Sequence, residues 1–243
     1  MDQAAAEPEA TLRLLSAGDV EVLGLLPYSS NYVFLARVKH DDREALAVYK
    51  PRRGERPLWD FPRGTLAARE VAAFSVSEAA GWGFVPPTVL RDDAPMGSGS
   101  LQLFIEHDPE EHYFTLTDSR LPEFATFAAF DVVINNADRK GGHILRDPNG
   151  RLWAVDHGVC FHTETKLRTV IWDLAEQKLG DTVTAALERL IVALRDPDGL
   201  GGELTQLLSA REASATLGRA EALLADGVLP VPETEHYLPW PLI

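Results

Sequence analysis

The chain has 243 residues, of which 45% are hydrophobic, and its 23 Lys and Arg against 37 Asp and Glu give a formal net charge of −14. This length and composition are typical of a folded chain with one large domain or two small lobes, so a disulfide framework is not required. The negative charge argues against non-specific binding to nucleic acid, and apolar runs such as residues 127–134 are far shorter than the ~20 residues of a membrane-spanning helix.

The N-terminal residues 1–10 are rich in Ala and Glu, and we expect them to form a flexible N-terminus. They have neither the basic nor the apolar region of a secretory leader. The single cysteine, Cys160, cannot form an internal disulfide. These features predict a cytoplasmic protein with no integral membrane segment.

Between residues 20 and 51, three β-rich runs are separated by Pro27-Tyr-Ser-Ser and by a charged turn at 41–44, which predicts three antiparallel strands. Thr65 is expected to cap a helix that runs to about Ala80. Extended segments at 84–90 and 100–106 then complete a sheet of about five strands.

Downstream, the apolar spacing changes, and a buried helix is predicted with Pro122 in its first turn and with apolar positions at Phe124, Phe127, Phe130, Val133 and Ile134. A tight β-hairpin is expected around Asp147-Pro-Asn-Gly, and leucine-rich patterns predict helices over 182–195 and 203–225. The chain is therefore predicted to be α+β, with a sheet lobe over 11–107 and a mainly helical lobe over 108–243.

The densest group of polar residues is Asn135-Asn-Ala-Asp-Arg-Lys-Gly-Gly-His, and the predicted hairpin joins it to Asp156-His-Gly. Because a short hairpin brings its two ends together, we expect Asp138, His143 and Asp156 to converge. Such a cluster suits a metal-phosphate site, where one carboxylate positions a hydroxyl and another binds a divalent ion.

The order of these parts resembles the protein-kinase-like fold. It is most similar to the atypical phosphatidylinositol 3- and 4-kinase superfamily, especially the type II phosphatidylinositol 4-kinases and the HipA-type kinases. The matching pieces, within residues 23–173, are Tyr-Lys50-Pro, Arg-Glu70-Val-Ala-Ala, Phe-Val-Pro-Pro-Thr, Gln102-Leu-Phe-Ile-Glu, Asn136-Ala-Asp138-Arg and Val-Asp156-His-Gly158. The resemblance implies a two-lobed fold, with a small antiparallel sheet and one helix followed by a mainly helical lobe.

The resemblance also implies how ATP would be bound. Lys50 would hold the phosphates, and Glu70 would orient Lys50 through an ion pair. A turn would cover the phosphates in place of a glycine-rich loop, and its residues are Ser29, Ser30 and Asn31. The adenine would contact a hinge made of Gln102, Leu103, Phe104 and Ile105.

For catalysis, the resemblance implies that Asp138 positions the substrate hydroxyl and that Asp156 ligates Mg²⁺ or Mn²⁺. Arg139 and Lys140 would neutralise charge on the transferring phosphoryl group. His143 stands where the family usually has an Asn that ligates a second metal ion. Because imidazole is a softer ligand than an amide oxygen, His143 suits Mn²⁺ or Zn²⁺ better than Mg²⁺, so either the activity prefers manganese or the second metal ion is absent.

The expected function is an ATP-dependent phosphotransferase that transfers the γ-phosphoryl group to a hydroxyl of a protein or of a small alcohol or inositol-type molecule. The alternative is a nucleotide-binding pseudokinase that acts as a sensor or scaffold, which His143 in place of Asn favours. Transfer of AMP is compatible with the same pocket. A metal-dependent hydrolase is a further hypothesis, with a site built from His143, Asp156, His157 and His162.

Overall fold

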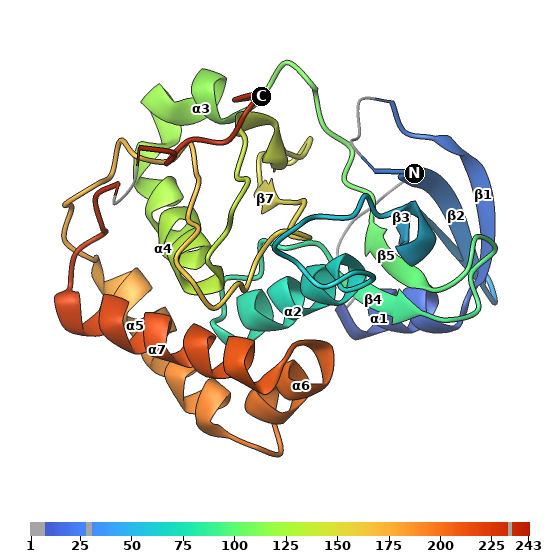
Figure 1. Ribbon diagram of the computed structural model, residues 1–243. Coiled ribbons are helices and arrows are strands. Elements are labelled where there is room, and N and C mark those ends of the chain that lie inside the picture. Colours follow the sequence, from blue (N-terminus) through green and yellow to red (C-terminus); the bar gives the residue numbers. More distant parts are fainter. Residues whose placement is uncertain (1–7, 28–30, 233–234) are drawn as a thin grey trace.

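The computed structural model describes residues 8–27, 31–232 and 235–243 (Figure 1). Its first half forms a five-stranded antiparallel sheet with strand order β1-β2-β3-β5-β4. The strands are β1 (Asp19–Leu25), β2 (Phe34–His40), β3 (Arg43–Pro51), β4 (Thr88–Arg91) and β5 (Gly99–Leu103). The predicted sheet is confirmed. Strand β4 begins four residues later than predicted, because Pro86 and Pro87 have no amide hydrogen for a strand ladder.

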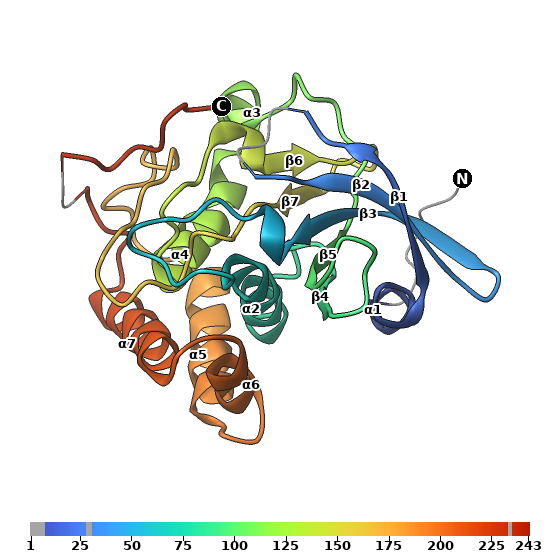
Figure 2. The same ribbon diagram turned by 45° about the vertical axis from the view of Figure 1, so that its right-hand side comes forward.

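Helix α1 (Pro8–Ala17), which the sequence pattern did not predict, packs on this sheet (Figure 2). Its Leu14 and Leu15 are buried in a cluster with residues of β2 and β3, including Val38 and Tyr49. Residues 8–10 are therefore the start of a helix and not part of a flexible N-terminus, whereas residues 1–7 lie outside the described residues. Burial of two leucines stabilises a helix of this length, which would be marginal in isolation.

Helix α2 (Leu66–Ala79) is buried on nearly every side, with ten of its fourteen residues buried. It packs between β4 and β5 on one side and the C-terminal helices on the other (Figure 1). Thr65 is at the predicted N-cap position, but its side chain makes no capping hydrogen bond. Instead, a carboxylate oxygen of Glu55 accepts a hydrogen bond from the Ala67 amide at 3.1 Å, which places a negative charge at the helix N-terminus.

The second half is mainly helical, and the predicted helix over 124–134 and the predicted hairpin are both present. Its elements are α3 (Tyr113–Arg120), α4 (Phe124–Ile134), β6 (Ile144–Arg146), β7 (Leu152–Ala154), α5 (Asp181–Arg195), α6 (Leu200–Leu207) and α7 (Ala210–Asp226), and 3₁₀ turns lie at Arg52–Gly54, Leu121–Glu123 and Gly141–His143. The predicted single helix over 203–225 is wrong. The chain is extended at Leu208, and a reciprocal capping box between Ser209 and Glu212 starts α7.

The main hydrophobic core is shared by both halves of the chain. Ala72 and Phe74 of α2 belong to the same buried cluster as Phe130 of α4 and Leu187 of α5. The lobe boundary near residue 107 stays a prediction. Because α2 belongs to this common core, its position is fixed from both sides.

A buried ion pair adds a polar tie between α2 and α7. Arg69 Nη2 lies 2.6 Å from Glu212 Oε1, and Arg69 Nη1 donates to the Cys160 carbonyl at 2.7 Å. The side chains are only 1% and 10% exposed. Since a buried charge is costly without its partner, this pair makes α2 depend on the C-terminal helices.

We expect Glu212→Gln to lower the free energy of unfolding by roughly 3 kcal/mol, because Gln preserves the capping box but leaves the Arg69 charge buried and unpaired. The matched control is Glu221→Gln, which lies in α7 like Glu212. It removes the exposed partner of Arg195 in α5 and should lower the free energy of unfolding by less than about 1 kcal/mol. Denaturant unfolding measures both variants. Equal losses would show that the buried pair does not hold α2.

Candidate active site

One lysine and two carboxylates meet where β3, α2 and the segment after β7 come together (Figure 2). Lys50 Nζ forms an ion pair with Glu70 Oε1 and lies 2.8 Å from Asp156 Oδ1. The second oxygen of Glu70, Oε2, accepts the His157 amide at 3.0 Å. Glu70 therefore holds both Lys50 and the backbone of the turn that carries Asp156.

The charges of this network stabilise one another. Burial alone would lower the pKa of Lys50, but the charges of Asp156 and Glu70 outweigh it and raise the pKa above its ordinary value. The Lys50 charge in turn lowers the pKa of Asp156, against the opposing effect of burial. At neutral pH the site therefore holds a cation suited to phosphate and an ionised carboxylate suited to a metal ion.

Backbone geometry fixes two members of the network. Asp156 has a φ of 63°, a left-handed conformation that Asp adopts more readily than most residues. Gly99 of β5 packs so closely on β3 that a Cβ atom there would overlap the Lys50 carbonyl oxygen. The position of Lys50 thus depends on the close pairing of β3 with β5.

A buried carboxylate, Asp131 of α4, organises the loop that follows its helix. Its two oxygens accept hydrogen bonds from the Arg139 guanidinium at 2.9 to 3.1 Å, from Asn136 Nδ2 at 3.0 Å and from Thr169 Oγ1 at 3.2 Å. Asp131 is not among the site residues predicted from the sequence. A lone carboxylate in the otherwise apolar run Phe-Ala-Thr-Phe-Ala-Ala-Phe-Asp-Val-Val-Ile was the available signal, since buried charges are normally paired.

The predicted catalytic role of Arg139 needs correction, because its side chain is fully buried. Besides Asp131, its guanidinium contacts His157 Nε2 at 2.7 Å and donates to the Val155 carbonyl at 3.0 Å. These partners are all internal, so Arg139 has no surface for a substrate. Arg139 is a positioning residue that ties the loop to the strand leading to Asp156.

Asp138 is the acidic residue of this loop that reaches solvent, with 31% of its side chain exposed. Its amide donates to Asn136 Oδ1 at 3.0 Å, and its Oδ2 lies 3.1 Å from Lys140 Nζ. Burial raises the pKa of Asp138, and the Lys140 charge opposes this. A raised pKa makes this carboxylate a better proton acceptor.

His143 and Asp156 form a candidate metal-binding pair. His143 Nε2 lies 3.3 Å from Asp156 Oδ2, and burial lowers the pKa of His143 to about 4 despite the Asp156 charge. The imidazole is therefore neutral at pH 7 and can offer a lone pair to a metal ion. In the described ranges no group of three or more His, Cys, Asp or Glu side chains could hold a metal, so an ion at this pair would need further oxygen ligands such as phosphate.

The other two histidines of the hydrolase hypothesis do not join this pair. His157 is fully buried against Arg139 and the ring of Phe130. His162 packs edge-on to Phe61, with ring centroids 5.5 Å apart. The four-residue metal site that the hydrolase hypothesis required is therefore not formed.

The predicted hinge lies at the end of β5, but its first residues are occupied by the sheet. Gln102 is buried and donates through Nε2 to Thr88 Oγ1 at 2.8 Å. The amides of Leu103 and Phe104 donate to carbonyls of neighbouring segments, each at 2.9 Å. The backbone of Phe104 and Ile105, beyond the last residue of β5, is the part of the predicted hinge that leaves the sheet.

An apolar cluster connects this hinge to the β6–β7 hairpin. Ile105, Leu145 and Trp153 are buried together, and Leu103 and Val155 pack against them. The site residues predicted from the sequence do not include those of the hairpin, although the continuous apolar run at 152–155 was a signal of a buried strand. This cluster offers a flat aromatic ring an apolar surface next to the backbone that leaves the sheet.

The predicted phosphate-covering turn is only partly described. Ser29 and Ser30 lie outside the described residues. Asn31 Oδ1 accepts the Arg56 amide at 2.8 Å, so this residue is tied to the loop after β3.

Comparisons with known proteins agree with this arrangement. The sequence profile of "Phosphatidylinositol 3- and 4-kinase" matches residues 68–210, which is more than half of the chain. The chain belongs to the phosphatidylinositol 3- and 4-kinase family. The resemblance that its motifs indicated is confirmed. The matched range contains Glu70, Asp138 and Asp156, whereas Lys50 precedes it.

Two relatives of similar sequence differ in how much of the chain they cover. Protein Rv2133c of Mycobacterium tuberculosis is 39% identical, with 94% of each chain aligned. Phosphatidylinositol 4-kinase gamma 4 of Oryza sativa is 28% identical over 52% of this chain, which corresponds to only 26% of the plant protein. Among solved structures, the Golgi casein kinase with Mn/ADP bound has a TM-score of 0.59 at 14% identity, over 97% of this chain and 80% of that one. This last similarity confirms the two-lobed, kinase-like fold.

We expect Asp131→Asn to loosen the loop around Asp138, because the Arg139 charge would lose its buried counter-ion. Hydrogen exchange should become faster at the Arg139 and Val170 amides, which bond to the Arg168 and Arg139 carbonyls. Amides of the β2–β3 hairpin are the internal control and should be unchanged. Uniform acceleration across the chain would instead show global destabilisation, and unchanged exchange at Arg139 would contradict the role of Asp131.

Proposed function

We propose that this protein is an ATP-dependent phosphotransferase that transfers the γ-phosphoryl group to a hydroxyl. The observation that carries the proposal is Lys50 paired with both Glu70 and Asp156. In kinases such a lysine binds the phosphates while its glutamate orients it and a nearby aspartate holds the metal ion. Membership of a family of kinases supports the same reading.

Each residue of the network has a distinct task in this proposal. The Lys50 ammonium gives up its ion pair with Asp156 and binds phosphate oxygens instead. Glu70 keeps that ammonium in place. Asp138, exposed on this loop, accepts a hydrogen bond from the acceptor hydroxyl. It takes the hydroxyl proton as the oxygen bonds to the γ-phosphorus and the bond from that phosphorus to the bridging oxygen breaks, which releases ADP. The adenine packs on the apolar cluster of Ile105 and Leu145 and bonds to the backbone that leaves β5.

Asp156 and His143 are the residues that would hold the metal ion. A divalent cation bound there supplies positive charge that neutralises the phosphate oxygens. A neutral imidazole beside a carboxylate suits Mn²⁺ better than the all-oxygen ligands that Mg²⁺ prefers. The Golgi casein kinase of similar fold was solved with Mn/ADP bound, which supports the use of a nucleotide and manganese here.

The acceptor is a hydroxyl of a protein or of a small molecule. The net charge of −14 disfavours a nucleic-acid acceptor. No helix in the described ranges combines the length and the apolarity needed to cross a bilayer. A second candidate function is a nucleotide-binding pseudokinase, favoured by His143 in place of the family's usual Asn.

The decisive assay compares transfer of label from γ-labelled and α-labelled ATP with Mn²⁺ or Mg²⁺, into the protein itself and into candidate alcohols. We expect label from the γ position only, with a loss on the order of 10²–10⁴-fold in Asp138→Asn and Asp156→Asn. Asp42→Asn, in the exposed turn between β2 and β3, is the matched control and should be unaffected. Transfer from the α position would indicate AMP transfer, and ATP binding without any turnover would favour the pseudokinase.

We expect His143→Asn to raise the ratio of Mg²⁺-supported to Mn²⁺-supported activity several-fold, because an amide oxygen replaces the imidazole nitrogen. Initial rates across a titration of each metal ion give this ratio. His40→Asn, at the exposed end of β2, is the control for loss of a histidine. An unchanged ratio would show that His143 does not ligate the metal ion.

A further inference from the structure

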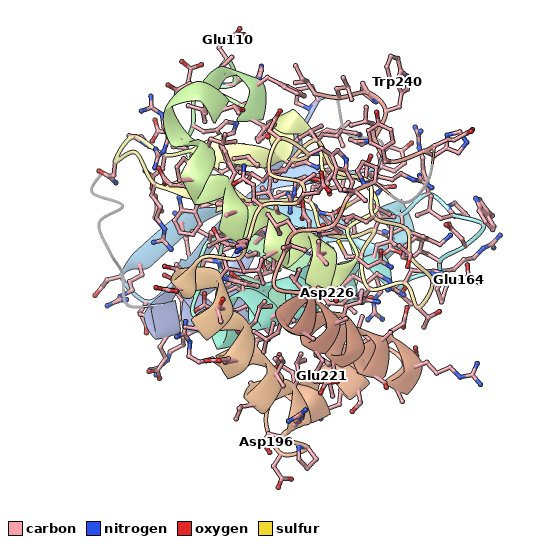
Figure 3. The ribbon with its side chains drawn as sticks, turned by 90° about the vertical axis from the view of Figure 1, so that its left-hand side faces the viewer. Glu110, Glu164, Asp196, Glu221, Asp226 and Trp240 are labelled. Atoms are coloured by element: carbon pink, nitrogen blue, oxygen red, sulfur yellow. The ribbon has the colours of Figure 1, made fainter. Side chains whose placement is uncertain are left out.

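A second site is suggested by a cavity of about 600 Å³ on the helical half of the molecule. It lies between the end of α4, residues 165–168, α7 and the segment that follows α7. Figure 3 looks onto this side of the molecule, with Asp226 at the end of α7. Lys50, Asp138 and Asp156 do not line the cavity, so it is separate from the candidate active site. Its volume is in the range of cavities that bind small organic molecules.

The lining of this cavity carries the opposite charge to the chain as a whole. Among the described residues it contains Lys166, Arg168 and Arg219 and the one carboxylate of Asp226, whereas the net charge of the chain is −14. Lys166 is already paired with Asp60, at 3.0 Å. Arg168 and Arg219 are the other two cations of the described lining; the Arg168 charge also acts on Asp138, and the Arg219 charge on Glu212.

Arg219 is a largely buried guanidinium whose hydrogen bonds go to neutral oxygens. It donates to the Val133 carbonyl at 2.8 Å, to the His162 carbonyl at 3.1 Å and to Thr216 Oγ1 at 3.1 Å. Burial lowers the pKa of Arg219 to about 10, so the group is still charged at neutral pH. A guanidinium has five N–H donors, and these bonds leave capacity for an anion.

The remaining lining is largely apolar. Leu223 and Ala222 of α7, Val132 of α4, Val228 and the Trp172 ring surround the space next to the two arginines. Covering such a surface with an apolar group is favourable, because apolar area is removed from water. The cavity therefore combines a charged end with an apolar body.

We propose that this cavity binds an amphipathic organic anion, with a carboxylate or phosphate held by Arg168 and Arg219 and an apolar body against α7. The site does not depend on the proposed phosphotransfer. It nevertheless borders the catalytic loop, because the Arg168 amide donates to the Asn136 carbonyl and the Arg168 carbonyl accepts the Arg139 amide, each at 2.9 Å.

Calorimetric titration of the whole chain tests the proposal with three probes of equal chain length: decanoate, decyl phosphate and decanol, each below its micelle concentration. We expect at least one of the anions to bind tenfold or more tightly than decanol, since a charge-assisted hydrogen bond contributes at least that factor. Tighter binding of decanoate identifies a carboxylate ligand, and tighter binding of decyl phosphate identifies a phosphate ester. Equal binding of decanol, or no binding of any probe, would overturn the proposal.

Two pairs of variants locate the binding. Ala222→Trp fills the cavity while preserving the bonds of Arg219, and it should weaken anion binding at least tenfold. Ala225→Trp, at an exposed position of the same helix outside the cavity, should have no effect. Arg168→Gln should weaken binding of the anions but not of decanol, whereas Arg211→Gln at the start of α7 should weaken neither. Binding that survives in Ala222→Trp would contradict the assignment to this cavity.

Discussion

The position of the Lys50 ammonium between Glu70 and Asp156 is the interaction on which the site depends. It joins the sheet, helix α2 and the turn after β7, which are far apart in the sequence. A buried lysine is costly unless carboxylates surround it, and each carboxylate here is also stabilised by the lysine. The network is therefore assembled only when both halves of the chain are folded and packed together.

Two buried ion pairs hold helix α2 and the loop of Asp138 in place. Arg69 and Glu212 tie α2, and with it Glu70, to the C-terminal helix α7. Arg139 and Asp131 tie the loop of Asp138 to α4. Because α2 is also part of the common core, its packing on both sides holds the backbone of Glu70 in place. The structure thus holds the side chains proposed to bind the nucleotide in place before any ligand arrives, which reduces the cost of ordering them.

The sequence predicted the parts of the fold that local patterns determine. Strand alternation, the apolar helix over 124–134 and the turn at Asp147 gave the sheet, α4 and the hairpin, and the family motifs indicated Lys50, Glu70 and Asp156 before any contact was visible. Long-range packing determined the rest. Whether Arg139 faces a substrate or a buried Asp131 depends on a contact between a helix and a loop, which spacing alone does not reveal. Likewise, α1 is stabilised by burial on the sheet.

The most direct measurement is a crystal structure of the protein with a non-hydrolysable ATP analogue and Mn²⁺. If Lys50 is the phosphate-binding residue, its ammonium will contact the phosphates and retain Glu70, while Mn²⁺ lies on Asp156 and the adenine packs against Ile105. A nucleotide bound elsewhere, with the ion pair between Lys50 and Asp156 unchanged, would contradict the central claim.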